Sequence, residues 1–124
     1  MTDLREASRL FEELEDFGGE ARAVLEMGHI HGVMNNFDEA RLDYMDAYRL
    51  YRRRQNKSGM AQASESLGKL EFGIRMLTQA IEDLKEARRL YRDLGERGAA
   101  TSVESYLEDA KASLARQEAK PERR

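Results

Sequence analysis

The sequence predicts an all-α fold of stacked helix-turn-helix units, and three observations support this prediction. An acid-Ala-x-Arg-Leu-aromatic segment occurs three times at a spacing of forty residues, as Glu6–Phe11, Asp46–Tyr51 and Glu86–Tyr91. A period of that length is typical of repeat architectures. Apolar residues recur at helical spacing along the chain, and Gly or Asn residues interrupt them. The 124 residues include one Pro, no Trp and 36% charged residues, a composition that suits long solvated helices.

The N-terminal part of the chain predicts two helices and the turn into a third. The first helix, about residues 2–16, has an apolar stripe on one face that is formed by Leu4, Ala7, Leu10, Phe11 and Leu14. The Gly18–Gly19 pair interrupts this stripe. The second helix has its apolar positions at Ala23, Val24, Met27, Ile30 and Met34. We expect Asn35 to take a left-handed conformation and Asn36 to cap the following helix, which makes an antiparallel pair.

The third and fourth helices follow the same pattern. The third covers about residues 37–55, with its apolar stripe at Phe37, Ala40, Tyr44, Ala47, Leu50 and Tyr51. It ends in the polar segment Asn56–Gly59, where Ser58 is a candidate cap for the next helix. The fourth helix then runs to about Ile74.

The fifth helix repeats the apolar pattern of the third between Leu77 and Tyr91, and Gly95 and Gly98 mark the last turn. The sixth covers about residues 99–117 and keeps its apolar residues on one stripe. The remaining residues are polar and predict a frayed tail. We therefore expect six antiparallel helices and no strand.

The small and aromatic positions resemble the tetratricopeptide repeat (TPR), in the forty-residue variety of G-protein-signalling scaffolds and bacterial peptide-sensing regulators. Met27-Gly28 and Leu67-Gly68 stand in for the Leu-Gly pair of the family's first helix. The second-helix triad is matched by Ala40, Tyr44, Ala47 and by Ala80, Leu84, Ala87. The resemblance implies a short right-handed superhelix, an α-solenoid, over residues 1–118. Its parts would be a half repeat at 2–17, full repeats at 20–55 and 60–94, a terminal helix at 97–118 and a tail at 119–124.

The small residues have a direct physical interpretation within such a stack. Gly28 and Gly68 leave space where the two helices of one repeat cross, and Ala7, Ala47 and Ala87 let neighbouring helices approach. A larger residue at these positions would force the helices apart.

The resemblance also implies a concave groove lined by the first helix of each pair. Its positions in this sequence are Arg22, Leu25, Glu26, His29, Gln62, Glu65, Ser66, Lys69, Phe72, Ser102, Ser105, Tyr106 and Asp109. Charged and apolar side chains mixed in this way suit an extended or helical peptide. They do not match the basic-plus-asparagine clamp of chaperone-binding relatives. We therefore expect a non-enzymatic adaptor or scaffold that binds an unidentified protein or peptide.

A second hypothesis is that the chain is a homo-oligomeric assembly module. The first helix has no front partner, and its apolar side chains exceed what the second helix can cover. An exposed end of this kind favours a closed homodimer. The candidate residues are Leu4, Phe11, Leu14, Phe17 and Tyr48.

Two positions depart from the family pattern. His31 and Glu71 stand where the family usually has a tyrosine, four residues after the Leu of Leu-Gly. Two interpretations stay open. They could form a partly buried His-carboxylate pair that responds to pH, or both could reach solvent or a backbone group. His29 and His31 are the only histidines and point to different sides of a helix, so we expect no metal site.

Composition excludes several functional classes. With no Cys, no Ser-His-Asp arrangement and no phosphate-binding Gly-rich loop, we expect neither catalytic residues nor a cofactor. A net charge of −3 gives no general attraction to nucleic acid. No apolar run reaches the roughly 20 residues of a membrane span, and no secretory signal begins the chain, so we expect a cytoplasmic protein without a membrane partner.

Overall fold

A computed structural model describes residues 5–6 and 17–119 of the chain. These residues form five helices and no strand, which confirms the all-α prediction for this part of the chain. The helices are α2 (Phe17–Val33), α3 (Phe37–Arg53), α4 (Lys57–Gly73), α5 (Leu77–Asp93) and α6 (Arg97–Ala119). Apart from Arg5 and Glu6, the predicted first helix lies outside the described residues, and so do residues 120–124 of the predicted tail.

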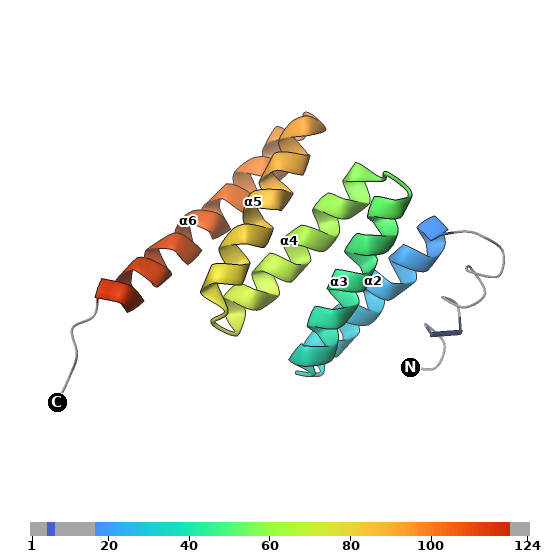
Figure 1. The fold of residues 1–124 in the computed structure, drawn as a ribbon, viewed down its shortest axis with the longest axis horizontal. Coiled ribbons are helices and arrows are strands. Elements are labelled where there is room, and N and C mark those ends of the chain that lie inside the picture. The colour runs from blue at the N-terminus through green and yellow to red at the C-terminus, as the bar shows by residue number, and fades with distance from the viewer. Residues whose placement is uncertain (1–4, 7–16, 120–124) are drawn as a thin grey trace.

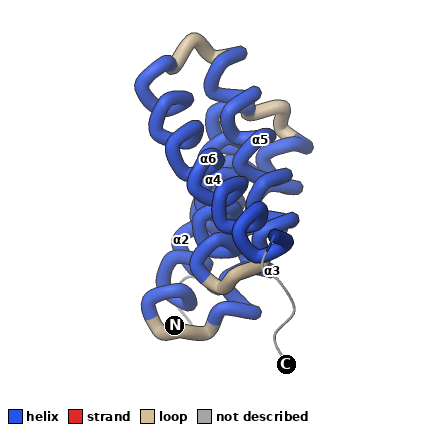
Figure 2. Tube along the Cα trace, turned by 90° about the vertical axis from the view of Figure 1, so that its left-hand side faces the viewer, coloured by secondary structure: helices blue, strands red, loops and turns tan. Residues whose placement is uncertain are grey.

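Helices α2 to α6 follow one another across the molecule in chain order (Figure 1). Consecutive helices pack against each other, and short turns join them (Figure 2). Helix α4 is central, because it contacts the other four described helices. We call α2, α4 and α6 the front helices, since α4 contacts both of the others. The back helices, α3 and α5, are bridged by long side chains rather than by close backbone packing.

The four turns between these helices share one geometry. Each has three residues, and its middle residue has a positive φ, at Asn35, Gln55, Arg75 and Gly95. In the first turn, the Asn36 N–H donates to the His31 carbonyl at 2.8 Å, and the Asn35 N–H donates to the Gly32 carbonyl at 3.1 Å. This is the Schellman motif, which satisfies the last carbonyls of a helix. The left-handed conformation predicted for Asn35 is confirmed, with a φ of 63°.

Three predictions about helix starts need correction. Asn36 precedes α3 as predicted, but its side chain makes no capping hydrogen bond. Asn56, rather than Ser58, caps α4, because its side-chain oxygen accepts a hydrogen bond of 2.9 Å from the Gly59 N–H. The Gly18–Gly19 pair lies within the first turn of α2 rather than before that helix.

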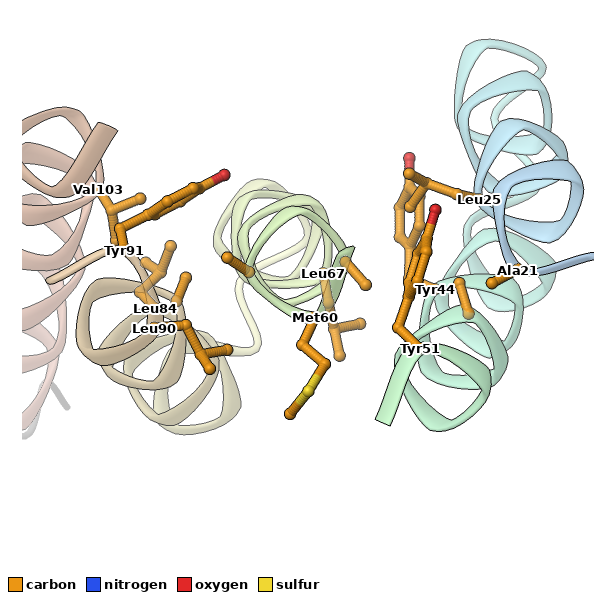
Figure 3. Packing of buried hydrophobic residues seen from close by; sticks show 14 of the residues in the cluster. Ala21, Leu25, Tyr44, Tyr51, Met60, Leu67, Leu84, Leu90, Tyr91 and Val103 are labelled. Carbon is orange, nitrogen blue, oxygen red and sulfur yellow. The ribbon is translucent and has the colours of Figure 1, made fainter. Parts of the chain in front are cut away.

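Buried apolar side chains form a continuous core between successive helices. Figure 3 shows Leu25 of α2 beside Tyr44 of α3. It also shows that Leu84 lies on the side of α5 that faces Val103 of α6. Leu67 of α4 lies between these two groups (Figure 3). The described helices therefore share one core that runs from α2 through to α6.

Glycine and alanine set the spacing of these helices. A Cβ atom built on Gly28 would lie 2.6 Å from the Tyr44 ring, and one on Gly68 would lie 2.6 Å from Leu84 Cγ. Ala47 and Ala87 are fully buried. The predicted close crossing within each helix pair is confirmed, as is the burial of these two alanines. Ala7 lies outside the described residues.

Candidate binding face

The structure brings the sequence-predicted groove residues together on the front helices. Four of them lie on α2, five on α4 and four on α6. Most are exposed or half-buried. Leu25 is the exception, because it is only 5% exposed and belongs to the core beside Tyr44. Its assignment to the groove surface is corrected accordingly, because the Leu25 side chain is buried in the core and offers almost no area to a partner.

Side chains of α2 and α4 meet at His29. The Nε2 atom of His29 lies 3.4 Å from the Ser66 hydroxyl, and its Nδ1 atom lies 3.7 Å from a Glu26 carboxylate oxygen. The imidazole also rests edge-on against the Tyr44 ring, with 5.4 Å between ring centroids. Since Tyr44 belongs to α3, this contact anchors an exposed side chain of the front face to the core.

Side chains of α4 and α6 meet at Tyr106. The Lys69 ammonium lies 4.7 Å from the centre of the Tyr106 ring, and the Phe72 ring meets that ring edge-on at 6.5 Å. Lys69 also forms an ion pair of 2.8 Å with Glu65. Glu65 in turn accepts a hydrogen bond of 2.7 Å from the Tyr91 hydroxyl, and burial followed by this bond raises the pKa of Tyr91.

The front face therefore carries two clusters of unlike side chains, one at each junction between front helices. The exposed residues Arg22, Gln62, Ser102, Ser105 and Asp109 lie on the same three helices. Such a surface can donate and accept hydrogen bonds and can cover an apolar side chain with an aromatic ring. These are the contacts by which helical surfaces hold a polypeptide segment.

His31 and Glu71 each pair with a back helix rather than directly with each other. The Nδ1 atom of His31 lies 2.6 Å from the Asp43 carboxylate, and both side chains are nearly buried. Burial raises the pKa of Asp43, although its hydrogen bond to His31 opposes this shift. Glu71 is fully buried and accepts a hydrogen bond of 2.8 Å from Arg41 Nε. The pair of a histidine and a carboxylate exists, but within one helix pair.

Sequence reasoning missed Arg41, Asp43 and Asp83 as members of these buried polar groups. One signal could have found the two aspartates, because they are forty residues apart, as are His31 and Glu71. The forty-residue repeat therefore places His31 and Glu71 at one equivalent position of the two helix pairs, and Asp43 and Asp83 at another. Which side chains meet depends on helix rotation, which the spacing alone does not specify.

The self-association candidates have different outcomes. Leu4, Phe11 and Leu14 lie outside the described residues, and Phe17 begins α2. Tyr48 was predicted as an exposed aromatic, and this is corrected, because the residue is partly buried. Its hydroxyl donates to Glu86 on the other back helix at 2.7 Å. Burial, together with this bond, raises the pKa of Tyr48 to about 12.

Across the described residues, no group of three His, Cys, Asp or Glu side chains is arranged to hold a metal ion. No described helix combines the length and the apolar character needed to cross a membrane. No family model matches the chain, and no curated protein is significantly similar to it.

Proposed function

We propose that the protein is a non-enzymatic adaptor of the tetratricopeptide-repeat type, which binds a peptide or helical segment of a partner protein along its front helices. The observation that carries the proposal is the pair of side-chain clusters at the α2–α4 and α4–α6 junctions. The first is centred on His29 and the second on Tyr106. Both combine polar groups with an aromatic ring, and both lie on residues that the groove hypothesis names.

The regularity of the backbone supports the architectural part of this proposal. Helices α2 to α5 have 17 residues each, and every turn between described helices has three residues. Left-handed residues recur at a spacing of forty, at Asn35 and Arg75 and again at Gln55 and Gly95. Equal units joined by equal turns suit a superhelical stack. In our proposal, residues 2–16 add the sixth helix at its N-terminal end.

The chemistry of the front face favours a particular kind of segment. Arg22 and Lys69 supply positive charge, and the exposed edge of the Phe72–Tyr106 pair supplies an apolar surface. A partner segment that places an acidic side chain next to an apolar one would satisfy both. Since Glu26, Glu65 and Asp109 lie on the same helices, we infer an amphipathic peptide with side chains of both charges as the bound class.

The test compares one substitution on the front face with a matched one on the back. Lys69→Glu reverses a charge in the Tyr106 cluster, whereas Lys85→Glu reverses an exposed charge on back helix α5. Partners captured by the wild-type chain would be identified, and their affinities for all three proteins measured by titration calorimetry. We expect at least a tenfold loss for Lys69→Glu and little change for Lys85→Glu. Equal affinities for the two variants would refute binding at the front face.

A specific observation favours the second candidate function, a homo-oligomeric assembly module. Val33, Met34 and Phe37 surround the first turn with exposed fractions of 85%, 56% and 37%. Such apolar exposure in one place is a common mark of an interface. Light scattering on the wild-type chain and on Met34→Lys would test it. A dimer that the substitution dissociates would support assembly, and a strict monomer across micromolar concentrations would exclude it.

A further inference from the structure

A cavity of about 660 Å³ lies between the last part of α6 and the turn that joins α4 to α5. The turn contributes Arg75, and α6 contributes Ser113, Arg116, Gln117 and Ala119. Both elements lie at the same end of the molecule (Figure 1). The described lining therefore holds two guanidinium groups and one primary amide, which are hydrogen-bond donors, and it holds no carboxylate.

The greater length of α6 explains why this cavity exists. Helix α6 has 23 residues, whereas α4 has 17. Ser113 follows Gly73, the last residue of α4, by the forty residues of the repeat. Residues 114–119 of α6 therefore continue past the level at which α4 ends. Arg75 follows Gly73 by two residues and lines the cavity together with this extension.

The cavity also continues the line of front-face residues on α6. Ser102, Ser105 and Asp109 are followed by Ser113 and Arg116, in steps of three or four residues. Side chains at this spacing lie on one side of a helix. A polypeptide segment bound along the front helices would therefore reach the cavity, and this step rests on the proposed function.

Neither arginine of the cavity is neutralised by a carboxylate of the described residues. Arg116 donates to the Ser113 hydroxyl at 3.2 Å. Within the described part of the chain, the side chain of Arg75 makes no hydrogen bond or ion pair. Arginine keeps its charge throughout the physiological pH range. Two positive groups are therefore available to an anion.

The cavity at the other end of α6 provides a contrast. It has a volume of about 500 Å³, and Arg92 and Arg97 line it. Glu104 lines it as well and forms ion pairs with Arg92 at 3.6 Å and with Arg88 at 2.8 Å. The chain itself supplies the negative charge there, whereas the described lining at Arg75 and Arg116 has none.

The backbone at Arg75 is a second, independent observation. Its φ of 69° lies in the left-handed region, which favours glycine and asparagine. The equivalent turn of the first helix pair has Asn35 at this position, and the turn before α6 has Gly95. The turn alone therefore gives no reason for an arginine, and the exposed side chain contributes nothing to the core. A guanidinium at the cavity wall gives the residue a role in binding.

We propose that this cavity binds the phosphate group of a phosphorylated side chain on the partner segment. A phosphate monoester carries a charge of about −1.5 to −2 near pH 7, which balances the two guanidinium groups, whereas a carboxylate balances only one. Arginine donates paired hydrogen bonds to phosphate oxygens, and the Gln117 amide supplies a further donor.

The experiment uses N-acetyl-O-phosphoserine amide as the probe, so it does not require the partner to be known. N-acetyl-glutamate amide and N-acetyl-serine amide are the carboxylate and neutral controls. NMR would follow the arginine Nε–H and Gln117 amide signals of the full chain, at low ionic strength because salt screens exposed charges. We expect saturable shifts at Arg75, Arg116 and Gln117, at least tenfold weaker binding of the glutamate compound, and no binding of the serine compound.

Arg75→Asn is the decisive variant, because it removes the guanidinium and copies the residue of the equivalent turn at Asn35. We expect the phosphoserine affinity to fall at least tenfold while the melting temperature stays the same or rises. Arg116→Gln should weaken binding to a similar extent. Arg97→Gln, at the other end of α6, is the matched control and should leave the affinity unchanged.

Further measurements separate this site from the proposed groove and from a site for free phosphate. Lys69→Glu should leave the phosphoserine affinity unchanged, so failure of the groove and failure of this cavity are distinguishable. Weaker binding of inorganic phosphate than of the phosphoserine probe supports a side chain as the source, and equal binding would overturn it. The proposal is also overturned if wild-type shifts do not saturate, if the phosphoserine and glutamate compounds bind equally, or if Arg75→Asn binds as wild type does.

Discussion

The two described helix pairs, α2–α3 and α4–α5, share a backbone plan but differ in their buried polar chemistry. In both, a glycine lets an aromatic or leucine side chain of the second helix approach closely, at Gly28 and at Gly68. In both, a left-handed residue closes the first helix. The first pair buries His31 with Asp43, whereas Glu71 of the second pair is buried against Arg41, which comes from α3 of the first pair. Small residues and turns therefore define the scaffold, and the polar positions are free to specialise.

Among the substitutions that test this difference between the helix pairs, the removal of Arg41 should reduce the free energy of unfolding most. Arg41→Met leaves the buried Glu71 carboxylate without its only cationic partner among the described residues. Breaking a buried ion pair from one side costs about 3–5 kcal/mol of unfolding free energy. Arg49→Met is the matched control on the same helix, because its pair with Asp46 is exposed and worth only about 0–1 kcal/mol. Urea denaturation at pH 8 measures both, and similar losses would contradict a buried charge at Glu71.

Enlarging the glycine at the helix crossing should have the next largest effect. Gly68→Leu forces a side chain into Leu84, and such overpacking costs about 1–3 kcal/mol. Gly73→Leu lies on the same helix, where an added Cβ would meet nothing within 4 Å. Thermal unfolding should show a clear loss for the first and almost none for the second. An unchanged melting temperature for Gly68→Leu would refute the proposed crossing.

Asp83 of the second helix pair should give the stability of the protein a marked pH dependence. The pKa of Asp83 is raised in the folded chain from its ordinary value of 3.8 to about 8. The folded state therefore holds a proton that the unfolded state has lost over this range, and stability falls as pH rises from about 4 toward 8. Asp83→Asn carries no titrating proton, so it should gain stability relative to wild type as pH increases. Chemical denaturation at pH 5.5 and pH 8.5 measures the difference, and parallel pH profiles would show that Asp83 does not hold the proton.

The smallest expected effect is a stabilisation within the first helix pair. An added Cβ on Gly32 would meet nothing within 4 Å, so alanine fits there without strain. Replacing glycine by alanine in a helix contributes roughly 0.5–1 kcal/mol, and less near a helix end. Gly28→Ala, one turn earlier, should instead destabilise by pressing on Tyr44. Opposite signs for these two substitutions in a urea titration are the expected result.

The sequence predicted the scaffold well because its determinants are local or periodic. Ala47 and Ala87 are buried as their spacing indicated, and Asn35 ends α2 as its preference for positive φ suggested. Gln55 and Arg75 also take positive φ, although neither residue type favours it. Three-residue turns between packed helices impose that conformation, and local preference does not reveal it.

The candidate sites were less predictable, because they depend on helix rotation. A small rotation of α2 about its own axis decides whether Leu25 faces the groove or the core. The repeat pattern does not specify this rotation. The partner of His31 lies twelve residues away on the next helix, at Asp43, rather than forty residues away. Polar pairs across a helix crossing require knowledge of side-chain direction, which neither composition nor period contains.

The order of the helices has a consequence for how the molecule responds to force and refolds. Among the described helices, none contacts a helix more than two places away along the chain. Contacts that are near in sequence close small loops, which favours rapid folding. Stability is then shared among neighbours rather than held by one long-range junction. Pulled from its ends, the chain should therefore lengthen in successive steps of about one helix pair, with α4 among the last to yield.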